Sequence, residues 1–133
     1  MSAPRTVVPP RLLAKVRTIC LALPDVVEER AWVGVRWTIR KRNFAHVVKI
    51  EDGWPPAYAR AAGSDGPLVV LTFRAQGMLH DTLRTAGPPF FLAEWGTRWG
   101  AQVIGMALGA KTDWSEVTVL VKESYGLLAT TRR

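Results

Sequence analysis

The alternation of apolar and polar residues over positions 31–50 constrains the fold most. Three apolar residues alternate with two arginines and a threonine along positions 35–40, and this period of two is typical of a strand with one buried face. The alternation resumes over positions 44–50. Residues 41–43 between the two runs favour a turn, because Asn43 tolerates positive φ. The segment therefore predicts a β-hairpin whose apolar side chains point inward and whose cations point outward, with Phe44 and His46 on one face of the second strand.

Helical spacing, with apolar residues three and four positions apart, occurs in three other segments, at positions 12–23, 76–86 and 113–129. Pro9-Pro10 suits the first turn of the first helix, and Pro24 ends it. At the third helix, Asp113 and Glu116 form a capping-box pattern. In the second helix we expect four residues to face inward: Met78, Leu79, Thr82 and Leu83.

Between these segments lie further strands. The near-continuous apolar run at 67–73 predicts a central strand buried on both faces. Segments 90–94 and 99–108 read as strands, and 51–67 as a loop with a short helical turn at 58–62. The order helix, strands, helix, strands, helix predicts a single α+β domain over 1–133, with a mostly antiparallel sheet and three main helices.

The charge of the chain is unevenly distributed. Ten Lys and Arg against three Asp and Glu place a balance of +7 in the first fifty residues, which equals the formal net charge of the whole chain. A pI near 10.3 promotes contact with polyanions. The single cysteine, Cys20, excludes an internal disulfide and fits a reducing compartment. With no apolar run of membrane-spanning length and no signal-peptide pattern, we expect a cytoplasmic protein without a membrane partner, either monomeric or weakly homodimeric.

No catalytic or metal-binding pattern is evident. His46 and His80 lie on different predicted elements, and their spacing from Cys20 matches no zinc motif. The glycines of segment 95–100 form neither a Walker loop nor a dinucleotide fingerprint. We therefore expect no enzyme activity, no cofactor and no metal, while an unrecognised enzyme stays a third alternative.

The basic hairpin carries the information about a partner. A hairpin with arginines on its face and tip can contact a phosphate backbone, because Arg binds phosphate in a bidentate manner. From charge alone, the alternative interpretation is a solvated strand face whose charges prevent edge-to-edge aggregation. The expected nucleic-acid-binding residues are Arg36, Arg40, Lys41 and Arg42, with Lys49 and Arg98 in support.

Several segments together resemble the MmcQ/YjbR family of small bacterial proteins. The resemblance rests on segments 21–29, 34–39, 43–45, 87–91 and 98–100 and on the helix at 113–129, where Ser124-Tyr125 followed by apolar residues is the most specific element. It implies a double-wing α+β domain, and the family is commonly described as DNA-binding. The chain departs from the family pattern in carrying Lys41-Arg42 where glycine is frequent, and in lacking a commonly basic position before Trp99.

We therefore predict a nucleic-acid-binding protein, with DNA as the first partner to test, that contacts phosphates with low sequence specificity. The alternative is a small-molecule or protein-interaction module built on an aromatic sheet face. Its members would be Trp37, Phe90, Phe91, Trp95 and Trp99. The pair Trp95 and Trp99 around Arg98 could also stack on bases, or belong to the core.

Overall fold

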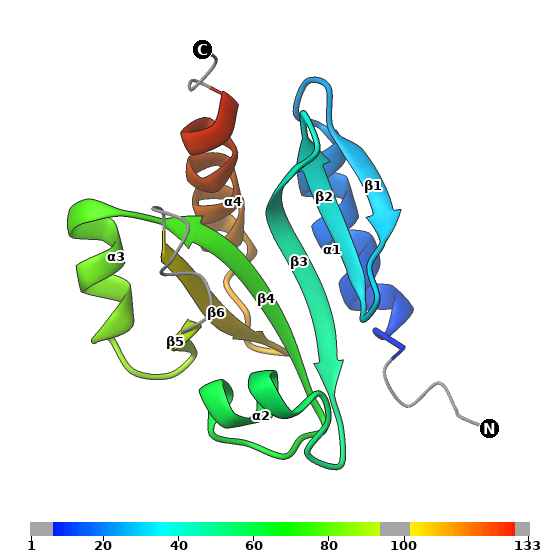
Figure 1. Ribbon diagram of the computed structural model, residues 1–133, viewed down its shortest axis with the longest axis vertical. Coiled ribbons are helices and arrows are strands. Elements are labelled where there is room, and N and C mark those ends of the chain that lie inside the picture. The colour runs from blue at the N-terminus through cyan, green and yellow to red at the C-terminus, as the bar shows by residue number, and fades with distance from the viewer. Residues whose placement is uncertain (1–6, 94–101, 130–133) are drawn as a thin grey trace.

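The computed structural model describes residues 7–93 and 102–129. Its centre is one antiparallel sheet of six strands in the order β1-β2-β3-β4-β6-β5 (Figure 1). The strands are β1 (Val27–Arg30), β2 (Val35–Ile39), β3 (Arg42–Ile50), β4 (Leu68–Ala75), β5 (Phe90–Ala93) and β6 (Gln102–Leu108). The helices of the described residues are α1 (Pro10–Leu21), α2 (Pro56–Ala62), α3 (Gly77–Arg84) and α4 (Trp114–Ala129).

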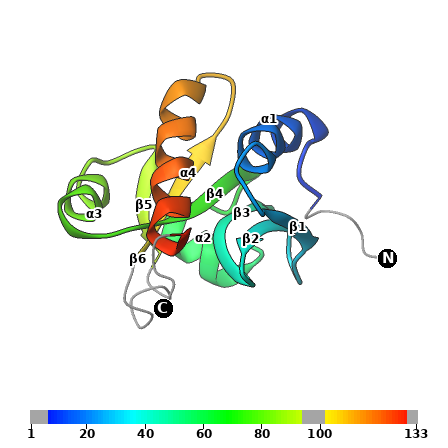
Figure 2. The ribbon, with the colours of Figure 1, turned by 90° about the horizontal axis from the view of Figure 1, so that it is seen from above.

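Helices cover both faces of the sheet. α1 and α4 lie on one face and α2 on the other (Figure 2). The larger core cluster joins α1 and α4 to the sheet and contains the fully buried ring of Trp37. The smaller cluster joins α2 to the opposite face and is centred on Val48, Ile50 and Val70. β4 therefore has buried residues on both faces, which confirms the prediction of a central strand.

The α+β class and the antiparallel sheet are confirmed, but the described residues form four helices where three main helices were predicted. The short helical turn expected at 58–62 is a seven-residue helix, α2, which begins at Pro56, ends at Ala62 and is capped by Gly63 with φ +68°. The predicted alternation begins later than position 31, because residues 31–34 form a tight turn between β1, a strand that the sequence analysis did not predict, and β2. Gly34 permits this turn, because its φ is +77° and a Cβ there would overlap the Val47 carbonyl oxygen.

The predicted alternation fails where β3 bulges. The pairing of β2 with β3 passes from Trp37↔Ala45 to Thr38↔Asn43 and skips Phe44. Phe44 therefore packs in the larger cluster beside Ala45, and not on the face of His46 as predicted. Thr38, expected to point outward, is buried as well, with 4% of its surface exposed.

The inward face of α3 differs from the prediction. Leu79 and Leu83 do pack inward, but Met78 is 83% exposed and Thr82 is exposed. His80 is buried in their place. The helix buries a stripe at positions 79, 80 and 83, which is rotated by about one residue from the stripe that the sequence suggested.

The remaining elements match their predictions more closely. In α4, the Asp113 carboxylate accepts hydrogen bonds from the backbone N–H groups of Ser115 and Glu116, at 3.0 and 3.2 Å, so this residue caps the helix as expected. Within the described parts of the chain, no helix combines the length and hydropathy needed to cross a bilayer.

Candidate nucleic-acid interface

The turn of the β2–β3 hairpin is Arg40-Lys41. Both residues have positive φ, at 51° and 67°, which is the backbone of a two-residue turn that matches the twist of the strands. Arg42 already belongs to β3, where it pairs with Ile39. The predicted turn at 41–43 is therefore wrong by one residue.

Arg40 is engaged by the C-terminal end of α4. Its guanidinium donates hydrogen bonds to the carbonyl oxygens of Leu128, at 3.3 Å, and Ala129, at 3.5 Å. These carbonyls belong to the last turn of the helix, where a cation also offsets the negative end of the helix dipole. Arg40 therefore holds the hairpin tip against α4 (Figure 1), and it is not the free phosphate-binding group that the sequence predicted.

Two other predicted phosphate-binding cations, Arg36 and Lys49, are paired with carboxylates. Arg36 donates through Nε and Nη2 to Oε1 of Glu29, at 2.9 and 2.7 Å, and Nζ of Lys49 lies 3.0 Å from Glu51. The two cations also lie on opposite faces of the sheet, since Arg36 pairs with His46 and Lys49 is three residues further along the same strand. The predicted common basic face of Arg36 and Lys49 is therefore not formed.

Lys41 and Arg42 are exposed, and no carboxylate of the described residues lies within ion-pair distance of either. A third cation, Arg74 at the end of β4, joins them. Its Nε donates to the Asn43 carbonyl oxygen at 2.7 Å. Burial, and next the positive charge of Arg42, lower the pKa of Arg74. We call Lys41, Arg42 and Arg74 the tip cluster.

Arg74 was missed by the sequence reading. The sequence does contain a signal for Arg74, because this single cation directly follows Phe73 at the end of a continuous apolar run. Such a residue emerges at the edge of the core, where its long side chain can reach solvent.

A serine from α4 sets the geometry of this end of the sheet. β3 and β4 pair regularly up to Ala45↔Phe73 and then diverge (Figure 1). In the gap, the buried Ser124 hydroxyl donates to the Phe44 carbonyl oxygen at 2.6 Å and accepts from the Arg74 N–H at 2.8 Å. The hydroxyl thus replaces a direct contact between the strands and fixes the backbone from which the Arg74 side chain extends.

Arg98, the sixth predicted contact, lies outside the described residues, as do Trp95 and Trp99. The described members of the aromatic set do not form one face. Trp37 is fully buried, and Phe90 and Phe91 pack against different core clusters, on opposite faces of the sheet.

Trp37 has a structural partner instead of a ligand. Its indole N–H donates to Glu28 Oε1 at 2.9 Å. Arg17 on α1 donates to both oxygens of that carboxylate, each at 2.9 Å. The hydrogen bond from Arg17 lowers the pKa of Glu28, so the carboxylate is charged at neutral pH and ties α1 to the sheet.

His46 belongs to a partly buried row of hydrogen bonds on the other face of the sheet. Its Nε2 lies 2.6 Å from the Val33 carbonyl oxygen, and its Nδ1 lies 3.0 Å from the Tyr58 hydroxyl. Burial lowers the pKa of His46 and raises the pKa of Tyr58 to about 12, so both are neutral at pH 7. In this state Nε2–H donates to Val33 and Nδ1 accepts from Tyr58. These two hydrogen bonds connect the β1–β2 turn to α2 through His46.

The other two residues considered for metal binding or catalysis, His80 and Cys20, lie on different helices. His80 lies on α3 and Cys20 is fully buried in α1, where burial raises the pKa of its thiol. No group of three or more potential metal ligands occurs among the residues that the structure describes.

Comparison with known proteins assigns neither a family nor a function to the chain. No family model matches the chain, and no curated protein matches it. The resemblance to the MmcQ/YjbR family therefore stays a prediction.

Proposed function

We propose that this protein binds nucleic acid through its phosphates, at the tip cluster of Lys41, Arg42 and Arg74. The observation that carries the proposal is the hydrogen bond from Arg74 Nε to the carbonyl oxygen of Asn43, at 2.7 Å. It holds the Arg74 guanidinium at the strand end that carries Lys41 and Arg42, and no carboxylate of the described chain lies within ion-pair distance of these cations. Cations held together without counter-charges attract a polyanion. Arginine also adds the planar, bidentate geometry that suits a phosphate.

The backbone of the turn supports this proposal. Asn and Gly adopt positive φ at the lowest cost, yet both turn positions carry cations, Arg40 and Lys41. Arg40 is accounted for by its hydrogen bonds to α4. The side chain of Lys41 has no such role in the described structure, so a phosphate contact is a reason to keep a cation in a strained position.

The binding that we propose has low sequence specificity, with DNA as the first partner to test. The three cations extend from a turn and from strand ends, and none of them lies on a helix of the described residues, whereas sequence-specific readout of base edges commonly uses side chains of a recognition helix. We also propose that the fold is of the MmcQ/YjbR double-wing type, supported by the segments of resemblance and by the antiparallel sheet. A cytoplasmic location is supported by the lone, buried Cys20.

A pair of double variants tests the proposal with matched charge. Lys41→Gln/Arg42→Gln removes two cations from the tip cluster, and Arg36→Gln/Lys49→Gln removes two cations that are already paired with Glu29 and Glu51. Two contacts of about 1 kcal/mol each correspond to a roughly 30-fold loss of affinity. We expect this loss for the first variant only, measured by fluorescence anisotropy with a labelled duplex.

The Arg36→Gln/Lys49→Gln control distinguishes a local effect of the tip cluster from a general effect of net charge. Equal losses for the two double variants would mean that binding follows net charge and not the tip cluster. Unchanged binding of the tip-cluster variant would refute the proposed site outright.

A further inference from the structure

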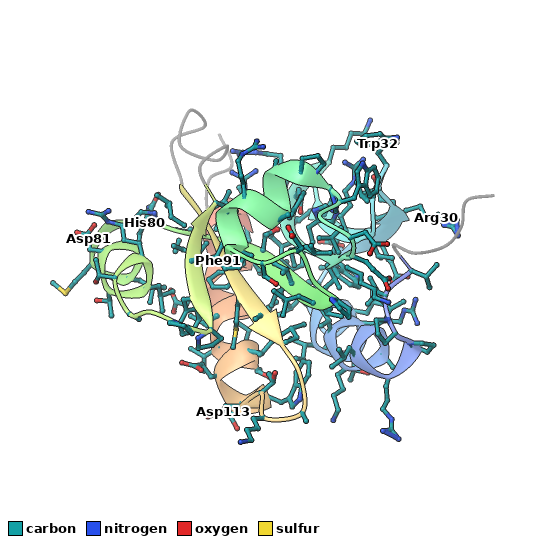
Figure 3. All side chains as sticks on the ribbon, turned by 90° about the horizontal axis from the view of Figure 1, so that it is seen from below. Arg30, Trp32, His80, Asp81, Phe91 and Asp113 are labelled. Atoms are coloured by element: carbon teal, nitrogen blue, oxygen red, sulfur yellow. The ribbon has the colours of Figure 1, made fainter. Side chains whose placement is uncertain are left out.

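Trp32 is the most exposed of the large hydrophobic side chains in the described structure. It lies in the β1–β2 turn with 89% of its surface exposed. Figure 3 shows it at the outer edge of the molecule, on the same side as Arg30 and away from α3. A ring of this size in water forgoes most of the free energy that burial would supply.

The turn that presents Trp32 is held from several sides. The Ala31 N–H donates to the Gly34 carbonyl oxygen at 3.0 Å. The next residue, Val33, is buried, and its carbonyl oxygen lies 2.6 Å from His46 Nε2. The ring of Trp54 meets that of Trp32 edge-on, with centroids 5.9 Å apart and an angle of 69° between the planes. Trp32 is thus fixed on a supported turn, and its ring is largely open to a ligand.

The surroundings of Trp32 favour one kind of occupant. The other exposed large hydrophobics of the described residues lie outside the β1–β2 turn, at Val7, Leu21, Val27, Met78 and Val119. Within residues 7–93 and 102–129, none of them therefore extends the turn into a large apolar patch of the kind that docks a protein. Arg30, two residues before Trp32 in the chain, is exposed and has no carboxylate of the described residues within ion-pair distance. An exposed ring that is held at its edge by Trp54, with an exposed cation on the same side of the molecule (Figure 3), is complementary to an unpaired nucleobase and its phosphate.

We propose that Trp32 is a stacking platform for an unpaired base, and hence that the preferred partner is single-stranded nucleic acid. This inference rests on the proposed function, because phosphate contacts at the tip cluster supply most of the affinity.

The turn at 31–34 and the hairpin tip lie at opposite ends of β2 (Figure 1). About seven residues at 3.3 Å each separate them, or roughly 20–25 Å. A strand of about six or seven nucleotides covers that distance.

Two oligonucleotides of equal charge separate stacking from phosphate binding. One is a twelve-nucleotide oligothymidylate, and the other is the abasic deoxyribose-phosphate strand of the same length. We expect the protein to bind the oligothymidylate about 5- to 150-fold more tightly, which is the range that one stacked base provides. Trp32→Ala should bring both affinities to the abasic value, while Met78→Ala, which truncates an exposed side chain on α3, should change neither.

Each outcome has one meaning. If the unmodified protein binds both strands equally and Trp32→Ala changes neither affinity, the stacking inference is wrong and the phosphate site stands. A preference for the base-bearing strand that survives Trp32→Ala also overturns the inference. If neither strand binds, the proposed function itself fails, and the stacking inference fails with it.

Discussion

Replacing Lys41 by glycine should make the protein more stable and a weaker binder of nucleic acid. Lys41 has a φ of 67°, and a left-handed backbone costs a residue other than glycine about 1–2 kcal/mol. Glycine relieves that cost but adds about 0.5–1 kcal/mol of chain entropy to the unfolded state. The midpoints of the two ranges give a net gain of about 0.75 kcal/mol, within limits of about 0 and 1.5 kcal/mol, which corresponds to roughly 3 °C in Tm. The loss of one phosphate contact lowers DNA affinity about fivefold.

Lys41→Ala is the matched control, because it removes the same charge and keeps the left-handed strain. Thermal unfolding followed by circular dichroism should show a higher Tm for the glycine variant than for the alanine variant. Anisotropy titrations should show the same loss of DNA affinity in both. Equal stability of the two variants would refute the left-handed turn, and undiminished DNA binding in both would remove Lys41 from the interface.

Three further predictions concern the framework of the site. Ser124→Ala leaves the Phe44 carbonyl and the Arg74 N–H without their partner; we expect a loss of about 2–4 kcal/mol in the free energy of unfolding, and a loss under 1 kcal/mol in urea titrations would contradict the bridging role. Gly105→Ala should destabilise the protein by about 1–3 kcal/mol, because a Cβ at Gly105 would overlap the ring of Phe91 on the neighbouring strand; an unchanged urea midpoint would show that this ring can move aside. Burial holds the pKa of His46 below its ordinary value near 6.5, so the folded state binds fewer protons than the unfolded state, and this contribution to stability is present above about pH 6.5 and is lost as the pH falls through the folded pKa. Between pH 7.5 and pH 5.5, the free energy of unfolding should therefore fall less in His46→Gln than in the unmodified protein. An equal fall in both proteins would contradict this effect of His46.

The parts of the fold that were predictable are those that local pattern determines. The apolar run before Arg74 indicated a central strand, because burial on both faces leaves no room for alternation. The Asp113 cap was readable because its partners, Ser115 and Glu116, follow it directly in the sequence. In both cases the interactions that decide the structure are close in the chain or repeated along it.

The candidate site was less predictable because its members are selected by pairings between distant segments. Arg36 is neutralised by Glu29, seven residues away, and this pairing exists only because the chain turns at 31–34 and makes β1 a separate strand. Arg74 joins the tip through Asn43, which is 31 residues away. Charge density along the sequence drew attention to the β2–β3 hairpin, but it could not distinguish cations with carboxylate partners from those without.

The most direct test of the phosphate site is the salt dependence of DNA binding. The logarithm of the association constant falls linearly with the logarithm of salt concentration, with a slope of about 0.9 for each phosphate contact on duplex DNA. We predict that Lys41→Gln/Arg42→Gln lowers the magnitude of this slope by about 1.8, and that Arg36→Gln/Lys49→Gln leaves it unchanged. A slope that stays the same when Lys41 and Arg42 are neutralised would contradict the account.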